Sequence, residues 1–68
     1  MTKSETQRYL SNVYSEWVQV NRDVSEKGFS FFGYINDLDN FSQFSFGRNS
    51  PYQVTAMWVT EWNESLGL

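Results

Sequence analysis

The sequence contains neither cysteine nor histidine, and these two absences exclude several kinds of site. Without cysteine, no disulfide bond can stabilise the fold and no thiolate can bind a metal ion. Without histidine, the chain lacks the commonest transition-metal ligand and the most frequent general base. We therefore expect no cofactor and no metal site. A chain of 68 residues must then be held together by its hydrophobic core or by association with another chain.

Basic residues are few, with five Lys and Arg against eight acidic residues, a net charge of −3 and a pI of about 4.6. The five are scattered along the chain: Lys3, Arg8, Arg22, Lys27 and Arg48. Proteins that bind nucleic acid by neutralising phosphates cluster such residues, so we expect no direct nucleic-acid binding. A third functional reading is that the acidic surface acts as a weak mimic of nucleic acid. Such a mimic would need a denser array of carboxylates.

Long apolar runs are also missing. No stretch approaches the ~18 apolar residues of a membrane span, and no apolar run of a signal peptide follows the polar N-terminus. We therefore predict a cytoplasmic protein that does not contact a membrane. The chain has room for one hydrophobic core, which predicts a single small domain over residues 1–68.

Aromatic residues are abundant, at 19% of the chain, with six Phe, four Tyr and three Trp. Each aromatic side chain buries about 150–250 Å², so a core of this size has too little room for all of them. We expect several to lie at the surface, where aromatic residues are typical of protein interfaces. The alternative is a small core that reaches its area with large side chains.

The first predicted helix spans residues 5–22. Its apolar positions recur at steps of three and four: Leu10, Val13, Tyr14, Trp17 and Val18. Val20 and Val24 continue the same side, and Ser4 or Thr6 is the expected N-cap. The apolar arc is wide, which indicates contact with two neighbouring elements.

The last predicted helix spans residues 51–66 and has clear signals at both ends. Ser50 is the expected N-cap, with Pro51 at the first helical position and Gln53 completing a capping box. Gly67 stands where a left-handed residue ends a helix, and Leu68 can fold back in a Schellman motif. Val54, Trp58 and Trp62 lie one turn apart on one side of this helix.

The middle of the chain fits two patterns, after an expected turn at residues 25–28. A helix over residues 30–42, capped by Ser30, places five apolar residues on one stripe: Phe31, Tyr34, Ile35, Leu38 and Phe41. A β-hairpin is the other pattern, with strands near residues 29–35 and 44–46. Leu38 favours the helix, because a hairpin leaves it in a polar turn, although Gly33 costs a helix about 1 kcal/mol. We predict an all-α, compact three-helix bundle, with an α+β helix–β-hairpin–helix fold as the alternative.

The residues offer little for catalysis. Asp37 and Asp39 are the only close acidic pair, and on a helix they face different directions. Residues 37–41 begin like a calcium loop, but Phe41 occupies a ligand position and no glycine follows. We predict that the protein is not an enzyme.

A surface for another protein is the remaining expectation. If the first helix packs by Leu10, Val13 and Trp17, then Tyr14 and Val18 are partly free. If the last helix packs by Val54, Trp58 and Trp62, then Tyr52 and Val59 are partly free. A more specific hypothesis places both tryptophans in a groove of the target, with Glu61 and Glu64 meeting basic residues; the alternative is that both belong to the core. The candidate contact residues are Tyr14, Val18, Tyr52, Trp58, Val59, Glu61 and Trp62.

Two functions fit these features. One is a small regulator or inhibitor that docks on a larger protein, of the size and composition frequent in phages and mobile elements. The other is a structural or accessory subunit of a homo-oligomeric or hetero-oligomeric assembly. The first predicts a monomer or weak dimer, whereas the second predicts an oligomer that is unstable on dilution.

Overall fold

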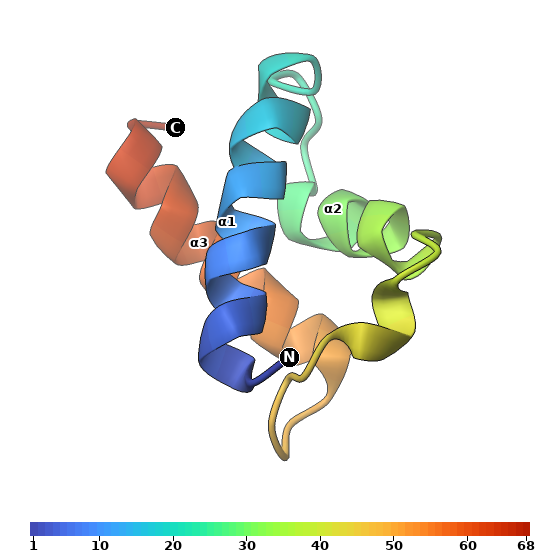
Figure 1. Cartoon of the computed structure of the whole chain (residues 1–68). Helices are drawn as coiled ribbons and strands as arrows, with labels where there is room; N and C mark the ends of the chain where they lie inside the picture. Colours follow the sequence, from blue (N-terminus) through green and yellow to red (C-terminus); the bar gives the residue numbers. More distant parts are fainter.

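The computed structural model describes all 68 residues, and its regular structure is helical throughout. The elements are α1 (Lys3–Gln19), α2 (Lys27–Asn36), a short 3₁₀ turn η1 (Phe41–Gln43) and α3 (Pro51–Leu66). α1 crosses in front of α3, and α2 lies to one side, where it packs against α3 (Figure 1). The predicted all-α fold of three helices is confirmed, and the hairpin alternative is wrong because residues 29–46 contain no strand. None of the helices combines the length and the apolar character needed to cross a membrane.

α1 begins earlier than the sequence indicated, because Thr2 is its N-cap. The hydroxyl of Thr2 accepts a hydrogen bond from the backbone N–H of Glu5 at 3.1 Å, and the Thr2 N–H donates to the Glu5 carboxylate at 2.8 Å. This reciprocal pair is a complete capping box. The expectation that Ser4 or Thr6 caps the helix is therefore wrong.

α1 also ends earlier, at Gln19 instead of residue 22. The side-chain amide of Asn21 donates to the carbonyl of Trp17 at 2.8 Å, which satisfies one of the free carbonyls at the helix end. Val20 then lies outside the helix and is 85% exposed. It does not continue the apolar side, contrary to the prediction.

α2 starts at Lys27 and ends at Asn36, whereas the predicted helix covered residues 30–42. Gly28 was expected in a turn, but it lies in the first turn of α2. A Cβ atom there would be 3.4 Å from the Cα atom of Ala56, so Gly28 permits close packing of α2 on α3. Ser30 is not a cap, since its N–H already donates to the carbonyl of Glu26 at 2.8 Å. Leu38 packs on the core from the turn after α2, not from a helix.

α3 has the predicted bounds. The Ser50 hydroxyl accepts from the N–H of Gln53 at 3.2 Å, and Pro51 occupies the first turn. The Gln53 side chain makes no return bond to the Ser50 N–H, so the predicted capping box is only half formed. At the other end Gly67 has a φ of 75°, and the N–H of Leu68 donates to the carbonyl of Asn63 at 2.8 Å. This is the expected Schellman motif.

The core combines side chains from all three helices with one from the connection before α3. Its nine buried hydrophobic residues are Leu10, Tyr14, Val18, Phe31, Ile35, Phe46, Val54, Trp58 and Val59. Thr6 is also fully buried, and its hydroxyl donates to the Thr2 carbonyl and accepts from the N–H of Ser45, each at 2.9 Å. Thr6 thereby ties α1 to the segment that carries Phe46.

All six Phe, four Tyr and three Trp side chains belong to one continuous network of ring contacts. Tyr14 lies near its centre, with its ring centroid 5.0 Å from that of Phe31 and 5.5 Å from that of Trp62. The Tyr14 hydroxyl donates a hydrogen bond to the side-chain oxygen of Asn63. Burial of the ring raises the pKa of Tyr14, and the bond to Asn63 opposes that rise.

Candidate protein-binding surface

Three residues expected to be partly free are buried, so that expectation is wrong for Tyr14, Val18 and Val59. On α1 the buried positions recur every four residues: Thr6, Leu10, Tyr14 and Val18. Val13 and Trp17, which were expected to point inward, lie at the edges of this stripe and are half-buried. The buried stripe of α1 is therefore rotated about the helix axis relative to the stripe of Leu10, Val13 and Trp17 that the sequence favoured.

The two tryptophans of α3 also contribute to the interior. Trp58 is a buried core residue, and its ring contacts both Phe46 and Trp62. Trp62 is half-buried beside Tyr14 and does not stand free of the fold. Of the remaining candidates, Glu61 and Tyr52 are exposed.

The most exposed aromatic side chains that touch one another come from α2 and the start of α3. Phe29 is 66% exposed and Tyr52 is 43% exposed. The Tyr52 ring makes edge-to-face contacts with Phe29 at 6.1 Å and with half-buried Phe32 at 5.7 Å. Together with exposed Gly33, these residues form what we call the α2–α3 aromatic surface.

The sequence of α2 explains why aromatic rings remain outside. Phe31 and Ile35, one helical turn apart, are the buried residues of this ten-residue helix. Phe29 is therefore turned away from the core and Phe32 lies at its edge, half-buried, because α2 is apolar around most of its circumference and cannot bury every side. Lys27 is the only charged residue in the helix.

A groove of about 280 Å³ runs beside Phe29 and Tyr52, between the start of α2 and α3. Gly28 and Ala56, which approach each other closely, both line it. The remaining lining is mostly polar: Ser25, Glu26, Lys27, Thr60 and Asn63, together with Val59. The aromatic surface thus borders a groove that offers hydrogen-bonding groups of both charge signs.

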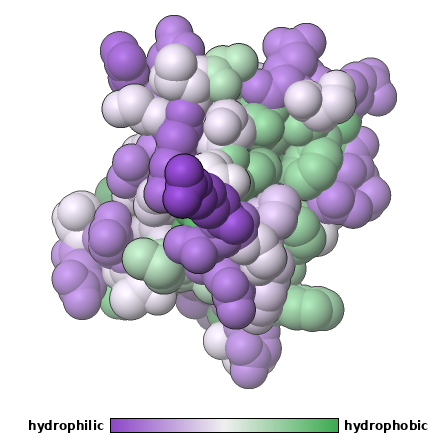
Figure 2. Space-filling view, turned by 90° about the horizontal axis from the view of Figure 1, so that it is seen from below, coloured by the Kyte–Doolittle hydropathy of each residue, from purple (hydrophilic) through white to green (hydrophobic).

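Hydrophobic residues are unevenly distributed over the molecule. Seen from below, they gather to the right of the centre, on the side where Figure 1 places α2, with polar residues on both flanks (Figure 2). Phe41, which lies in η1, contacts Phe32, and their ring centroids are 6.1 Å apart. Through Phe41 the aromatic surface is continuous with the packed rings of Phe44 and Phe46.

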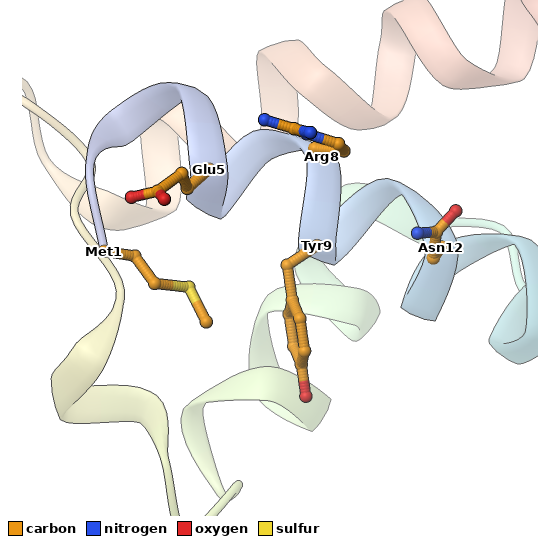
Figure 3. Close-up of a pocket in the computed structure, with 5 residues that line it drawn as sticks. All are labelled: Met1, Glu5, Arg8, Tyr9 and Asn12. Carbon is orange, nitrogen blue, oxygen red and sulfur yellow. The ribbon is translucent and has the colours of Figure 1, made fainter.

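A second depression, of about 350 Å³, lies on α1 and is lined by Met1, Glu5, Arg8, Tyr9 and Asn12 (Figure 3). The polar ends of Glu5, Arg8 and Asn12 point in different directions (Figure 3). The Glu5 carboxylate already accepts a hydrogen bond from the N–H of Thr2 in the helix cap. The hydrogen bonds from Thr2 lower the pKa of Glu5. Tyr9 packs on Phe44 at 5.7 Å.

No protein-family model matches the chain, and comparisons with curated proteins and with solved structures give no match.

Sequence reasoning missed Phe29, Phe32 and Gly33 as surface residues. It began the middle helix at Ser30, which left Phe29 in a connection. The available signal was the pair Phe31 and Ile35 at a four-residue spacing, because a helix that buries this pair turns Phe29 outward.

Proposed function

We propose that the protein is a non-catalytic binding module, a regulator or inhibitor that docks on a larger protein through the α2–α3 aromatic surface. The observation that carries this proposal is the exposure of Phe29, which is 66% accessible on an otherwise folded helix. Phe29 touches Tyr52, which in turn touches Phe32, and a contiguous exposed apolar patch of this kind usually marks an interaction site.

The rings of this surface are held in place before any partner arrives. Tyr52 lies between Phe29 and Phe32, with interplanar angles of 77° and 74°. Such contacts restrict the side-chain rotamers, so binding loses less conformational entropy. Burying one phenylalanine contributes about 1.5–3 kcal/mol to association, which makes Phe29 the expected centre of the contact.

The groove beside the rings supplies the polar rim that such a contact needs. Glu26 and Lys27 carry opposite charges, and Thr60 adds a hydroxyl. Polar groups around an aromatic centre fix the orientation of the partner and exclude water from the centre.

The test compares Phe29→Ala and Tyr52→Ala with Met57→Ala in quantitative capture from lysate of the source cells. Met57 is the matched control, because it is 60% exposed on α3 and makes no part of the aromatic surface. We expect one protein to be retained by the wild type and by Met57→Ala, and to be lost with Phe29→Ala. Circular dichroism checks that each variant is folded. Equal retention by Phe29→Ala and the wild type contradicts the proposal.

A further inference from the structure

The two glycines of α2 have different surroundings. At Gly28 an added Cβ atom would lie 3.4 Å from Ala56, so close packing between helices explains the glycine. At Gly33 an added Cβ atom would have no neighbour within 4 Å. Gly33 does not have a positive φ either, since only Gly47 and Gly67 do. A glycine inside a helix weakens it relative to alanine, and nothing within this chain explains Gly33.

Gly33 belongs to an exposed stripe on α2. Phe29 precedes it by one helical turn, while Glu26 and Asn36 continue the stripe at three-residue steps. All four residues are exposed. The alternating steps of three, four and three are the spacing by which one helix meets another.

On this stripe the exposed ring of Phe29 projects from the helix, and Gly33, which has no side chain, leaves open space one turn later. We propose that a second copy of this chain binds here, with its α2 antiparallel, so that Phe29 lies over the partner's Gly33. By two-fold symmetry the partner's Phe29 then lies over Gly33, so a single stripe is complementary to itself. This inference goes beyond the proposed function, because a second copy is a further protein that binds at the same surface.

The polar ends of the stripe fit this register. The antiparallel arrangement brings Glu26 opposite the partner's Asn36, whose amide donates to the carboxylate. The same arrangement makes the dipoles of the two α2 helices point in opposite directions. The chain carries a net charge of −3, and Glu26 is the only charged residue of the stripe, so few like charges meet when two copies pair along α2.

The size of the contact sets its strength. A ten-residue helix is about 15 Å long, so the stripe buries far less than the ~800 Å² per chain of a stable interface. We therefore expect a transient dimer with a Kd on the order of 100 µM. Phe29 is then released from the dimer at lower concentration and becomes available to a larger protein.

Sedimentation equilibrium of the full chain from about 10 µM to about 1 mM tests the dimer. The wild type and Met57→Ala are expected to fit a monomer–dimer equilibrium with the same Kd. Phe29→Ala removes the projection and Gly33→Leu fills the gap, so each should weaken the dimer at least about tenfold. Circular dichroism of the same samples confirms that the monomers are folded.

Gly33→Ala gives the sharpest result. Its methyl group is free of contacts in the monomer, so the melting temperature should rise by about 4–8 °C at low concentration. If Gly33 receives the partner's Phe29, the same variant weakens the dimer at least about threefold. A higher melting temperature with an unchanged dimer Kd contradicts the inference.

The two proposals fail in different ways. A wild type that is monomeric at 1 mM overturns the dimer, and docking on a larger protein stands if capture still depends on Phe29. A dimer that depends on Gly33, with no larger protein whose capture depends on Phe29, supports the dimer and overturns that docking.

Discussion

The hydroxyl of Tyr14 on α1 donates a hydrogen bond to the side-chain oxygen of Asn63 on α3, across 49 residues of sequence. The Tyr14 ring is fully buried and touches Phe31, Trp17 and Trp62. One side chain therefore joins all three helices, through its ring and through its hydroxyl.

Tyr14→Phe is expected to lower the free energy of unfolding by about 1–2 kcal/mol, because the ring contacts remain while Asn63 loses its donor. Urea denaturation followed by tryptophan fluorescence measures the change. Tyr9→Phe is the matched control, since the Tyr9 hydroxyl is exposed and takes part only in a 3.4 Å hydrogen bond from Asn40. An equal loss in both variants contradicts the role given to Tyr14.

The stability of the fold should fall at high pH because of the same residue. Burial raises the pKa of Tyr14 above its ordinary value of 10.0, so the unfolded state loses this proton at lower pH than the folded state. The contribution of the protonated hydroxyl is complete below pH 10 and is lost as pH rises through the folded-state pKa. Denaturation of the wild type and Tyr14→Phe between pH 8 and about pH 12 should show the steeper decline in the wild type. Parallel curves would show that Tyr14 is not responsible.

Thr55→Val is expected to stabilise the protein by about 1 kcal/mol. Thr55 is fully buried, and its hydroxyl has no hydrogen-bond partner. Valine has nearly the same shape without the unpaired polar group. Thermal denaturation of the variant should give a higher melting temperature than that of the wild type. Thr6→Val should have the opposite effect, because the Thr6 hydroxyl makes two hydrogen bonds. A lower melting temperature for Thr55→Val contradicts the expectation.

Gly67→Ala is expected to cost about 1 kcal/mol, because Gly67 has a φ of 75°, a conformation that alanine adopts with strain. A Cβ atom at Gly67 would have no neighbour within 4 Å, so backbone strain is the only expected cause of the loss. Urea denaturation gives the magnitude. An unchanged free energy of unfolding would indicate that the end of α3 frays without affecting the fold.

The ends of α3 were predictable because their signals are local. Ser50 and Pro51 begin the helix, and Gly67 ends it through hydrogen bonds within a few residues. The start of α2 was not predictable in this way, since its N-cap Glu26 makes no side-chain cap. Where α2 begins, Gly28 packs against Ala56, which lies far away in the sequence.

The candidate contact residues were harder to predict than the helices. Leu10, Val13, Tyr14, Trp17 and Val18 make a wide apolar arc, and a small rotation of α1 exchanges the buried residues for the exposed ones. The rotation is set by contacts with other elements, including the bond between Tyr14 and Asn63 and the one between Thr6 and Ser45. Tyr52 is the aromatic member of the predicted contact set that the structure leaves exposed.

The proposal that Phe29 is the centre of a protein-binding surface is tested most directly by site-specific photo-crosslinking in the source cells. Benzoylphenylalanine in place of Phe29 keeps an aromatic ring at the surface, and the same group in place of Met57 provides the control on another exposed site. We expect a discrete crosslinked protein, either a second copy or a larger chain, from position 29 and none of comparable yield from position 57. Equal crosslinking from both positions, or none from position 29, would contradict the proposal.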